Sequence, residues 1–316
     1  MTPQKSPVPS PQSPVPSPQA PVSRPQSPVF LLGPTASGKH EIAIHLAERL
    51  GAEIISVDSM KVYRGMDIGT AKPGREVLAR VPHHLVDICE PSETYSAGRF
   101  VRDAAEARRG IESRGKRALF VGGTSLYYKA YRYGMFEGPP ADPVLRDELI
   151  AEGPAALHAE LSRVDPAAAK RIHPNDLKRL VRAVEVFRKT GERISARQSQ
   201  FDRPKGEAKV FILRSGDLAS RVERRVRRMI EAGLVHEVRK LLARPWSKEG
   251  RAAVGYREIV DHLEGRSTLE EAEREIVRDT MRFTRRQATW FKTFTDASWI
   301  EASDRPDETA SRVSSL

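Results

Sequence analysis

The segment over residues 33–40 reads Gly33-Pro34-Thr35-Ala36-Ser37-Gly38-Lys39-His40, which has the spacing of a P-loop, G-x-x-x-x-G-K-[ST], at every position but the last. An apolar run over residues 29–32 precedes it, and a helical pattern over residues 41–50 follows it. A strand, a loop with inward-facing N–H groups and a helix N-terminus form a cradle for a phosphate group. The segment therefore predicts an α/β fold with a P-loop NTPase-like parallel sheet, and a di- or triphosphate site at one edge of that sheet.

His40 occupies the position where the P-loop pattern has Ser or Thr. The hydroxyl of that residue ligates the Mg²⁺ that bridges phosphate oxygens, and an imidazole offers no hydroxyl. No protein ligand for a metal is therefore assigned, and Mg²⁺ as a cofactor would be held through the phosphate groups. The residues predicted to bind these groups are Gly33, Pro34, Thr35, Ala36, Ser37, Gly38, Lys39 and His40.

Asp58 ends a second apolar run, over residues 52–57. If this run is a strand of the same parallel sheet, its carboxyl end lies at the edge where the P-loop lies. Three roles are open for the Asp58 carboxylate, which can organise a metal, act as a general base toward the substrate, or cap the next turn.

A third apolar run, over residues 118–121, leads into Gly122-Gly123-Thr124-Ser125. A nucleotide hydrolase is expected to place an Asp or Glu near such a strand end, where it holds the metal or orients water. Here the run ends in two glycines and a hydroxyl. The pattern therefore disfavours nucleotide hydrolysis.

The composition favours a soluble protein with a polyanionic partner. The 316 residues include 53 Lys and Arg against 42 Asp and Glu, which gives a formal net charge of +11. Cys89 is the single cysteine, no apolar run is long enough to span a bilayer, and the sequence has no signal-peptide pattern. We expect a cytoplasmic monomer without membrane contact.

The N-terminal segment, residues 1–28, is predicted to be a disordered tail. It contains Ser-Pro-Val-Pro-Ser-Pro-Gln twice in tandem, starting at Ser6 and at Ser13. Proline at this density favours solvated polyproline II and prevents a packed core. The folded part is therefore expected to begin near residue 29.

A series of motifs follows along the chain. The longest is the run Asp58-Ser59-Met60-Lys61-Val62-Tyr63-Arg64-Gly65-Met66-Asp67-Ile68-Gly69-Thr70-Ala71-Lys72-Pro73. Later motifs are His83-His84-Leu85-Val86-Asp87, Pro91-Ser92-Glu93-Thr94-Tyr95-Ser96, Gly122-Gly123-Thr124, Val254-Gly255-Tyr256-Arg257 and Arg285-Arg286-Gln287-Ala288-Thr289-Trp290-Phe291. Together they resemble the tRNA dimethylallyltransferase (isopentenylpyrophosphate:tRNA transferase) family, and the resemblance covers residues 29–299.

The resemblance implies transfer of a dimethylallyl group from dimethylallyl diphosphate to N6 of the adenosine 3′ to the anticodon in tRNA. Asp58 matches the general base of the family and Thr124 matches its active-site threonine, so both are assigned as catalytic. The chemistry agrees, because the departing diphosphate needs positive charge and the exocyclic amine has to lose a proton. The P-loop would then hold a leaving group rather than a nucleotide.

The residues assigned to tRNA binding come from three parts of the chain. After the second and third apolar runs they are Asp58, Ser59, Met60, Lys61 and Thr124; in the middle section they are Arg146, Lys178, Arg179, Leu180, Val181 and Arg182; near the C-terminus they are Tyr256, Arg257, Arg285, Arg286 and Gln287. Arginines can contact phosphates, and aromatic rings among them can stack on unpaired bases. A solvated face of an amphipathic helix is the alternative role for the basic residues near position 180.

A mostly helical section interrupts the α/β pattern. We expect residues 29–133 and 205–300 to form the P-loop core with C-terminal helices, residues 134–204 to form a helical insertion domain that binds tRNA, and residues 301–316 to form a C-terminal tail. The resemblance to the family also implies that one arginine among Arg221, Arg224, Arg225, Arg227 and Arg228 faces the diphosphate, and Arg225 is preferred. Helical spacing places Phe283, Trp290 and Phe291 on one buried stripe.

Two other functions remain open. A P-loop nucleotide kinase would bind ATP in the same loop, although His40 lacks the hydroxyl for its metal. A catalytically impaired homologue that only binds tRNA is suggested by His40 and Lys61. Preference for ATP over dimethylallyl diphosphate would favour the kinase, and tRNA binding without transfer would favour the impaired homologue.

Overall fold

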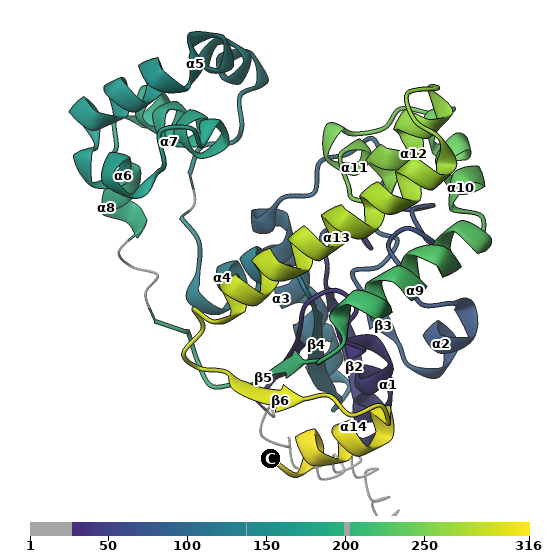
Figure 1. Cartoon of the computed structure of the whole chain (residues 1–316). Coiled ribbons are helices and arrows are strands. Elements are labelled where there is room, and N and C mark those ends of the chain that lie inside the picture. The colour runs from purple at the N-terminus through teal and green to yellow at the C-terminus, as the bar shows by residue number, and fades with distance from the viewer. Residues whose placement is uncertain (1–26, 137, 199–202) are drawn as a thin grey trace, which may run out of the picture.

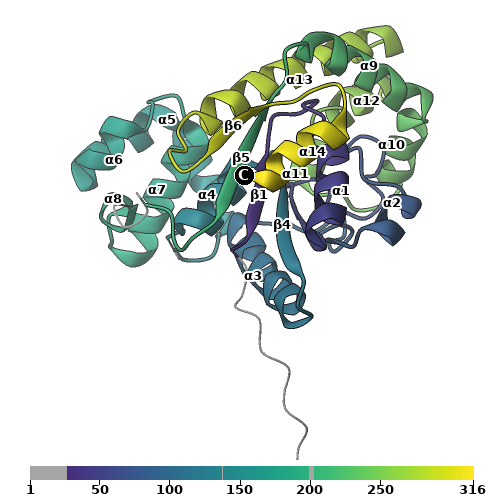
Figure 2. The same ribbon diagram turned by 90° about the horizontal axis from the view of Figure 1, so that it is seen from below.

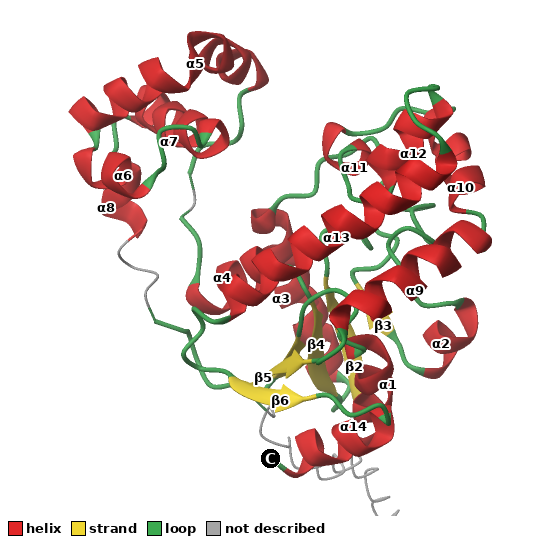
Figure 3. Cartoon of the chain, viewed as in Figure 1, coloured by secondary structure: helices red, strands yellow, loops and turns green. Residues whose placement is uncertain are grey.

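The described residues form a six-stranded sheet in which each pair of neighbouring strands is parallel. The computed structural model describes residues 27–136, 138–198 and 203–316. The strands are β1 (Val29–Leu32), β2 (Ala52–Val57), β3 (His83–His84), β4 (Arg117–Gly122), β5 (Lys209–Arg214) and β6 (Ser298–Glu301), in the spatial order β3-β2-β4-β1-β5-β6 (Figure 3). The predicted α/β fold with a parallel sheet is therefore confirmed. The predicted disordered tail lies outside the described residues, apart from residues 27 and 28.

The four inner strands of the sheet can be recognised in the sequence as continuous apolar runs. β2, β4, β1 and β5 are covered on both faces, and such strands read as continuous apolar runs. β1 lies between β4 and β5, with Leu32 opposite Gly122 and Ile212. The edge strands β3 and β6 are short and only partly buried, so no apolar run marks them.

Each face of the sheet has its own hydrophobic core, because alternate residues of a strand point to opposite faces. Phe30 and Leu32 pack in a first core with α3 (Ala97–Ser113) and α4 (Ser125–Tyr133). Val29 and Leu31 pack in a second core with α1 (Lys39–Leu50) and α14 (Pro306–Ser315). Figure 2 shows α14 next to α1, with α3 on the other side of β4.

The prediction that residues 301–316 form a C-terminal tail outside the core is wrong for most of this segment. It contains the end of β6 and all of α14, whose Ala310 and Val313 are buried in the second core against α1. The apolar face of α14 consists of small side chains three residues apart, which give a weak helical pattern in the sequence. The core therefore extends to the last described helix.

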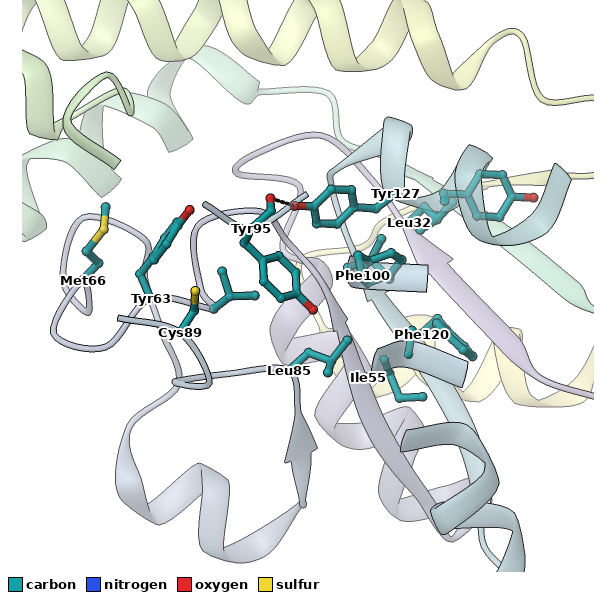
Figure 4. Packing of buried hydrophobic residues seen from close by; sticks show 14 of the residues in the cluster. Leu32, Ile55, Tyr63, Met66, Leu85, Cys89, Tyr95, Phe100, Phe120 and Tyr127 are labelled. Carbon is teal, nitrogen blue, oxygen red and sulfur yellow. Dashed lines mark hydrogen bonds between the residues drawn. The ribbon is translucent and has the colours of Figure 1, made fainter. Parts of the chain in front are cut away.

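The segment between β2 and α3 has little regular structure apart from α2 (Arg75–Arg80) and β3, yet it is firmly packed. Tyr63, Met66 and Cys89 are buried in the first core. The hydroxyl of Tyr127 donates to the carbonyl of Tyr95 at 3.0 Å (Figure 4). This packing fixes the long motif that begins at Asp58.

The helices after β5 form a second group. They are α9 (Leu218–Glu231), α10 (Leu234–Leu242), α11 (Lys248–Arg251), α12 (Tyr256–Leu263) and α13 (Leu269–Phe291). α13 is the longest of them and contacts α9, α12 and α4 (Figure 1). The predicted buried stripe holds at Phe291 but is wrong at Phe283, which is 39% exposed.

A third group consists of α5 (Pro143–Val164), α6 (Pro166–Arg171), α7 (Leu177–Thr190) and α8 (Ile194–Gln198). α5 is interrupted at Gly153, which has a φ of 81° and precedes Pro154. These helices share a hydrophobic core of their own, and Figure 1 shows them apart from α9–α13. A separate core is what a helical insertion requires, and the boundaries 134–204 stay a prediction.

None of the described helices combines the length and the apolar character needed to cross a membrane.

Glu185 of α7 is a buried charge in this helical group, with an exposed fraction of 0%. Its carboxylate accepts hydrogen bonds from Arg146 Nε at 2.9 Å, Arg182 Nη1 at 2.6 Å and the backbone N–H of Asp142 at 2.9 Å. Burial raises the pKa of the Glu185 carboxyl, but these donors outweigh burial and leave the pKa below its ordinary value.

Replacing Glu185→Gln should lower the free energy of unfolding by about 2 kcal/mol at pH 7, because three donors lose the charge they were ordered around. A carboxyl whose pKa is lower in the folded state stabilises the fold above its unfolded pKa and loses that contribution as the pH falls. The difference between the two proteins should therefore shrink below pH 4.5, the ordinary pKa of Glu. Urea denaturation at neutral and acidic pH measures the free energy of unfolding of both proteins. An equal difference between them at the two pH values would contradict this prediction.

Candidate active site

The P-loop follows the carboxyl end of β1. The N–H of Gly33 donates to the carbonyl of Gly122 at 3.2 Å, which joins the start of the loop to the end of β4. Gly38 has a φ of 81°, and a Cβ there would lie 2.7 Å from Nη2 of Arg221. Only glycine therefore fits at this position. The loop passes directly into α1, whose first N–H groups have no partner within the helix.

Gln287 of α13 fixes the P-loop. Its Oε1 accepts from the backbone N–H of Thr35 at 2.8 Å and from the Thr35 hydroxyl at 3.1 Å, while its Nε2 donates to the carbonyl of Gly123 at 2.8 Å. The side chain is buried. The prediction that Gln287 contacts tRNA is therefore wrong for its side chain, because the amide is hidden and both its ends are used within the protein.

A cavity of about 1020 Å³ opens beside the P-loop. It is lined by Thr35, Ala36, Gly38, Lys39 and His40, by Asp58 and Lys61 after β2, by residues of the following loop, and by Arg221, Arg224, Arg225 and Arg228 of α9. Glu41, Asp67 and Asp87 also line it, and the carboxylates of Asp67 and Asp87 each lie 2.5 Å from the Lys72 ammonium. Lys and Arg side chains outnumber the acidic ones in the lining. Cations therefore predominate, and the cavity suits an anion.

Lys39 lies among other cations in this cavity. Its Nζ donates to the carbonyl of Pro34 at 3.0 Å. Burial, followed by repulsion from Lys61 and Arg225, lowers the pKa of Lys39 from 10.5 to about 7. Burial also lowers the pKa of Lys61 and of Arg225. The positive charge is thus held at a cost that an arriving anion would relieve.

His40 lies against His83 of β3, with 5.3 Å between the ring centroids. Within the described part of the chain, the buried Nε2 of each ring has no hydrogen-bond partner. Nδ1 of His83 lies 2.7 Å from the carbonyl of Val81, so Nδ1 carries the hydrogen and Nε2 is an acceptor. Both rings line a small cavity of about 20 Å³, which is enough for one water molecule. Burial, then Lys61, lowers the pKa of His40 to about 3, so its imidazole is neutral.

Asp58 and Thr124 follow the neighbouring strands β2 and β4. Asp58 Oδ1 accepts from the backbone N–H groups of Met60 at 2.9 Å and Lys61 at 3.3 Å, and Thr124 Oγ1 accepts from the N–H of Ser59 at 3.1 Å. The Asp58 carboxylate thus caps the next turn, one of the three roles left open by the sequence. Both of these bonds go to Oδ1, and within the described residues Oδ2 accepts no hydrogen bond.

The wall opposite the P-loop depends on Glu237 of α10. Its carboxylate accepts from the backbone N–H groups of Asp67, Ile68 and Gly69 at 3.0, 2.8 and 3.2 Å. The hydroxyl of Tyr256 donates to the same carboxylate at 2.7 Å, and Tyr256 is only 1% exposed. The prediction that Tyr256 contacts tRNA is therefore wrong for its ring, which lies in the core and supports the cavity wall.

The arginines of α9 separate by helical face. Arg221, Arg224, Arg225 and Arg228 line the cavity, whereas Arg227 does not. Arg221 Nε donates to the carbonyl of Ala36 at 2.9 Å and so braces the P-loop. The preference for Arg225 as the diphosphate contact stays a prediction. The contact of Arg221 had no signal in the sequence beyond its place one helical turn before Arg225.

The residues assigned to tRNA binding divide by exposure. Leu180 and Val181 are buried in the core of α5–α8, so their assignment is wrong for the side chains. Arg146 and Arg182 are both bound to Glu185. The assigned side chains that lie on the surface are Lys178, Arg179, Arg257, Arg285 and Arg286. Ser59, Met60 and Lys61 are partly exposed at or near the cavity.

The residues at the P-loop do not fit a Mg²⁺ site. His40 presents an imidazole where a hydroxyl oxygen is needed, and Mg²⁺ prefers oxygen ligands. No group of three His, Cys, Asp or Glu side chains capable of holding a metal occurs in residues 27–136, 138–198 and 203–316. Asp58, one of the carboxylates that line the cavity, shares it with Lys39, Lys61 and Arg225.

The parallel sheet and the P-loop define a P-loop α/β protein, and the cavity beside the loop is lined mainly by cationic side chains. The family model described as IPP transferase matches residues 61–294, and the model described as isopentenyl transferase matches residues 28–87. The chain belongs to the IPP transferase family.

Relatives and solved structures agree with this membership. The chain is 47% identical over 279 residues to tRNA dimethylallyltransferase 1 of Citrifermentans bemidjiense, which covers 86% of this chain and 91% of the relative. It is 46% identical to the tRNA dimethylallyltransferase of Thermotoga petrophila, over 84% of this chain and 90% of the relative. The crystal structure of a tRNA isopentenylpyrophosphate transferase from Bacillus halodurans matches with a TM-score of 0.68 at 38% identity, over 92% of this chain and 94% of that chain. A eukaryotic dimethylallyltransferase acting on tRNA matches with a TM-score of 0.78 at 26% identity, over 91% and 77%.

Replacing Gln287→Leu should weaken binding of inorganic pyrophosphate by about tenfold, because the N–H of Thr35 and the carbonyl of Gly123 lose their partner and the P-loop loses its shape. Isothermal titration calorimetry measures the affinity. Thr289→Ala, on an exposed position of the same helix, is the control and should bind as the wild type does. Equal affinity in the Gln287 variant would show that the P-loop does not depend on this amide.

Pyrophosphate binding at pH 8 should draw a proton into the protein. With a pKa of about 7, Lys39 is mostly neutral in the empty site at that pH, and an anion beside it favours the ammonium form. Lys61 and Arg225 oppose this charge and Asp58 favours it. Calorimetry in two buffers of different ionisation enthalpy counts the protons, and subtracting the count for Lys39→Met removes the protonation of pyrophosphate itself. The difference in proton uptake between the wild type and Lys39→Met should become small at pH 6, where Lys39 is already protonated. A difference of the same size at pH 6 would contradict the assignment of the proton to Lys39.

Proposed function

We propose that this chain transfers a dimethylallyl group from dimethylallyl diphosphate to N6 of the adenosine 3′ to the anticodon in tRNA, which gives N6-dimethylallyladenosine. The observation that carries the proposal is that Lys39 of the P-loop and Asp58 of the next strand line one cationic cavity. The printed names of the relatives, tRNA dimethylallyltransferase, support the same enzyme class. The protein is a prenyltransferase whose substrate is tRNA.

The P-loop side of the cavity takes the leaving group. When the allylic C–O bond breaks, both bonding electrons remain on the diphosphate, so its departure needs positive charge close by. Lys39, Arg225 and the N–H groups at the start of α1 supply that charge. Arg221 acts through the P-loop, whose Ala36 carbonyl it holds.

The β2 side of the cavity takes the proton. The N6 amine becomes more acidic as its bond to the allylic carbon forms, and Asp58 Oδ2 accepts its proton. The two backbone N–H groups that hold Oδ1 fix the direction of the carboxylate. Thr124, which is tied to Ser59 in the same turn, donates its hydroxyl hydrogen to a diphosphate oxygen.

The tRNA is bound by surface cations and its target adenine leaves the base stack. Arg285 and Arg286 lie on α13, beside the exposed ring of Phe283, which is available to stack on an unpaired base. Lys178 and Arg179 offer phosphate contacts on α7. In this scheme α13 and the helical group bind RNA while the sheet edge performs the chemistry.

The two alternatives gain no support of their own. A nucleotide kinase or hydrolase would use a protein-held metal, and neither His40 nor the end of β4 provides for one. A homologue that has lost catalysis would have no need to keep Lys39, Asp58 and Thr124 together.

Replacing Asp58→Asn should lower the rate of transfer by about a hundredfold or more, because the amide keeps the shape of the turn but cannot take the proton. Mass spectrometry of digested nucleosides from tRNA incubated with dimethylallyl diphosphate measures the product. Binding of tRNA, measured by filter retention, should remain. Asp307→Asn on α14 is the control and should leave turnover unchanged, whereas unchanged turnover in the Asp58 variant would remove this residue as the base.

A further inference from the structure

The prenyl donor brings a strongly charged diphosphate into a site that lacks the usual means of binding a divalent ion. In a P-loop, the hydroxyl after the lysine holds Mg²⁺ against the phosphate oxygens. His40 at that position has no hydroxyl, and its imidazole is neutral. The charge that Mg²⁺ would have supplied therefore has to come from elsewhere, and it has to lie close to His40.

Lys61 lies in that place. It lines both the large cavity and the small cavity beneath His40, together with Lys39 and Asp58. Its backbone N–H is held by Asp58 Oδ1 at 3.3 Å, so the turn that carries Lys61 is fixed to the carboxyl end of β2. Its charge acts on both P-loop neighbours, since it contributes to the lowered pKa of Lys39 and of His40.

We propose that the ammonium group of Lys61 takes the place of the divalent cation, so that this chain binds the diphosphate of its prenyl donor without a metal ion. The inference rests on the proposed function, because it concerns the same diphosphate site. Lys61 and Lys39 then face the diphosphate from the turn after β2 and from the P-loop, and Arg225 faces it from α9.

The electrostatics of the cavity favour this arrangement over a metal. A Mg²⁺ ion would have to enter beside Lys39, Lys61 and Arg225, which line the same cavity, and repulsion from Lys61 and Arg225 already lowers the pKa of Lys39. Asp58 is the one anion among the charged groups that act on Lys39 and Lys61. Unlike a metal ion, the Lys61 ammonium needs no protein ligands, and it is covalently part of a turn that Asp58 holds. The cation therefore remains in the site between turnovers.

The neutrality of His40 is part of the same arrangement. A protonated imidazole would add another charge to Lys39 and Lys61, and burial together with these neighbours keeps it neutral. Its Nε2, like that of His83, faces a cavity that holds one water molecule at most. The alternative is that the Nε2 atoms of His40 and His83 bind a softer metal ion such as Zn²⁺, and the experiment below tests this.

The test uses inorganic pyrophosphate as the probe and calorimetry on the full chain, with EDTA, with Mg²⁺ and with Zn²⁺. The wild type should bind in EDTA with an affinity within about twofold of that in Mg²⁺. Lys61→Gln should bind about tenfold to a hundredfold more weakly in EDTA, as expected for the loss of a contact to a charged group. The double variant Lys61→Gln with His40→Ser should regain affinity only when Mg²⁺ is added. Lys116→Gln, an exposed lysine just before β4 and thus at the opposite edge of the sheet, controls for net charge.

Two results would overturn the proposal. Loss of pyrophosphate binding by the wild type in EDTA, with recovery in Mg²⁺, would mean that a metal is still required. Stronger binding in Zn²⁺ that disappears in His40→Ala would place an ion on the histidine pair instead. Circular dichroism of each variant separates loss of binding from loss of fold.

The proposed transfer reaction is tested apart from this. Product formation on an anticodon stem-loop RNA in EDTA and potassium chloride should persist, since the stem-loop folds without divalent ions. Absence of product under all conditions, with metal-free pyrophosphate binding intact, would contradict the proposed function and leave the inference about Lys61 standing.

Discussion

The active site depends on positive charges that the fold holds close together where water reaches them poorly. Lys39, Lys61 and Arg225 come from three different elements; Lys61 and Arg225 lower the pKa of Lys39, and Arg225 lowers the pKa of Lys61. Flexible side chains would separate under this repulsion, but their backbones are fixed to the sheet edge and to α9. The positions of these cationic groups are therefore set before the substrate arrives, and the Lys39 amine completes its charge when an anion binds, which is how the site stabilises a leaving group.

The parallel sheet explains how distant residues meet. The carboxyl ends of β1, β2 and β4 lie at one edge, so the P-loop, Asp58 and Thr124 become neighbours although they are far apart in the chain. The cationic face of α9 closes the same edge. The helices α5–α8 have a core of their own, so their surface can vary without disturbing the chemistry.

The sequence predicts the interior of the sheet and the P-loop because both follow from simple patterns. Apolar runs mark the four inner strands, while α14 is missed because small side chains form its buried face. Motifs identify positions that matter but not the direction of a side chain. The motifs therefore predict tRNA contacts for Gln287 and Tyr256, whereas the Gln287 amide binds the P-loop and the Tyr256 hydroxyl binds Glu237 inside the protein. The same holds for Leu180 and Val181, which stand among basic residues in the sequence but lie on the buried side of α7.

The Gln287 amide has a consequence for the order of events. The helix that presents Arg285 and Arg286 to solvent is the same helix whose Gln287 shapes the P-loop at Thr35. If RNA binds at the proposed surface of α13, a change in this helix would reach the P-loop directly through the hydrogen bonds of Gln287. Thermodynamic linkage is reciprocal, so a donor that orders the P-loop must alter RNA affinity by the same factor as RNA alters donor affinity. One buried amide can thus make the two substrates cooperative.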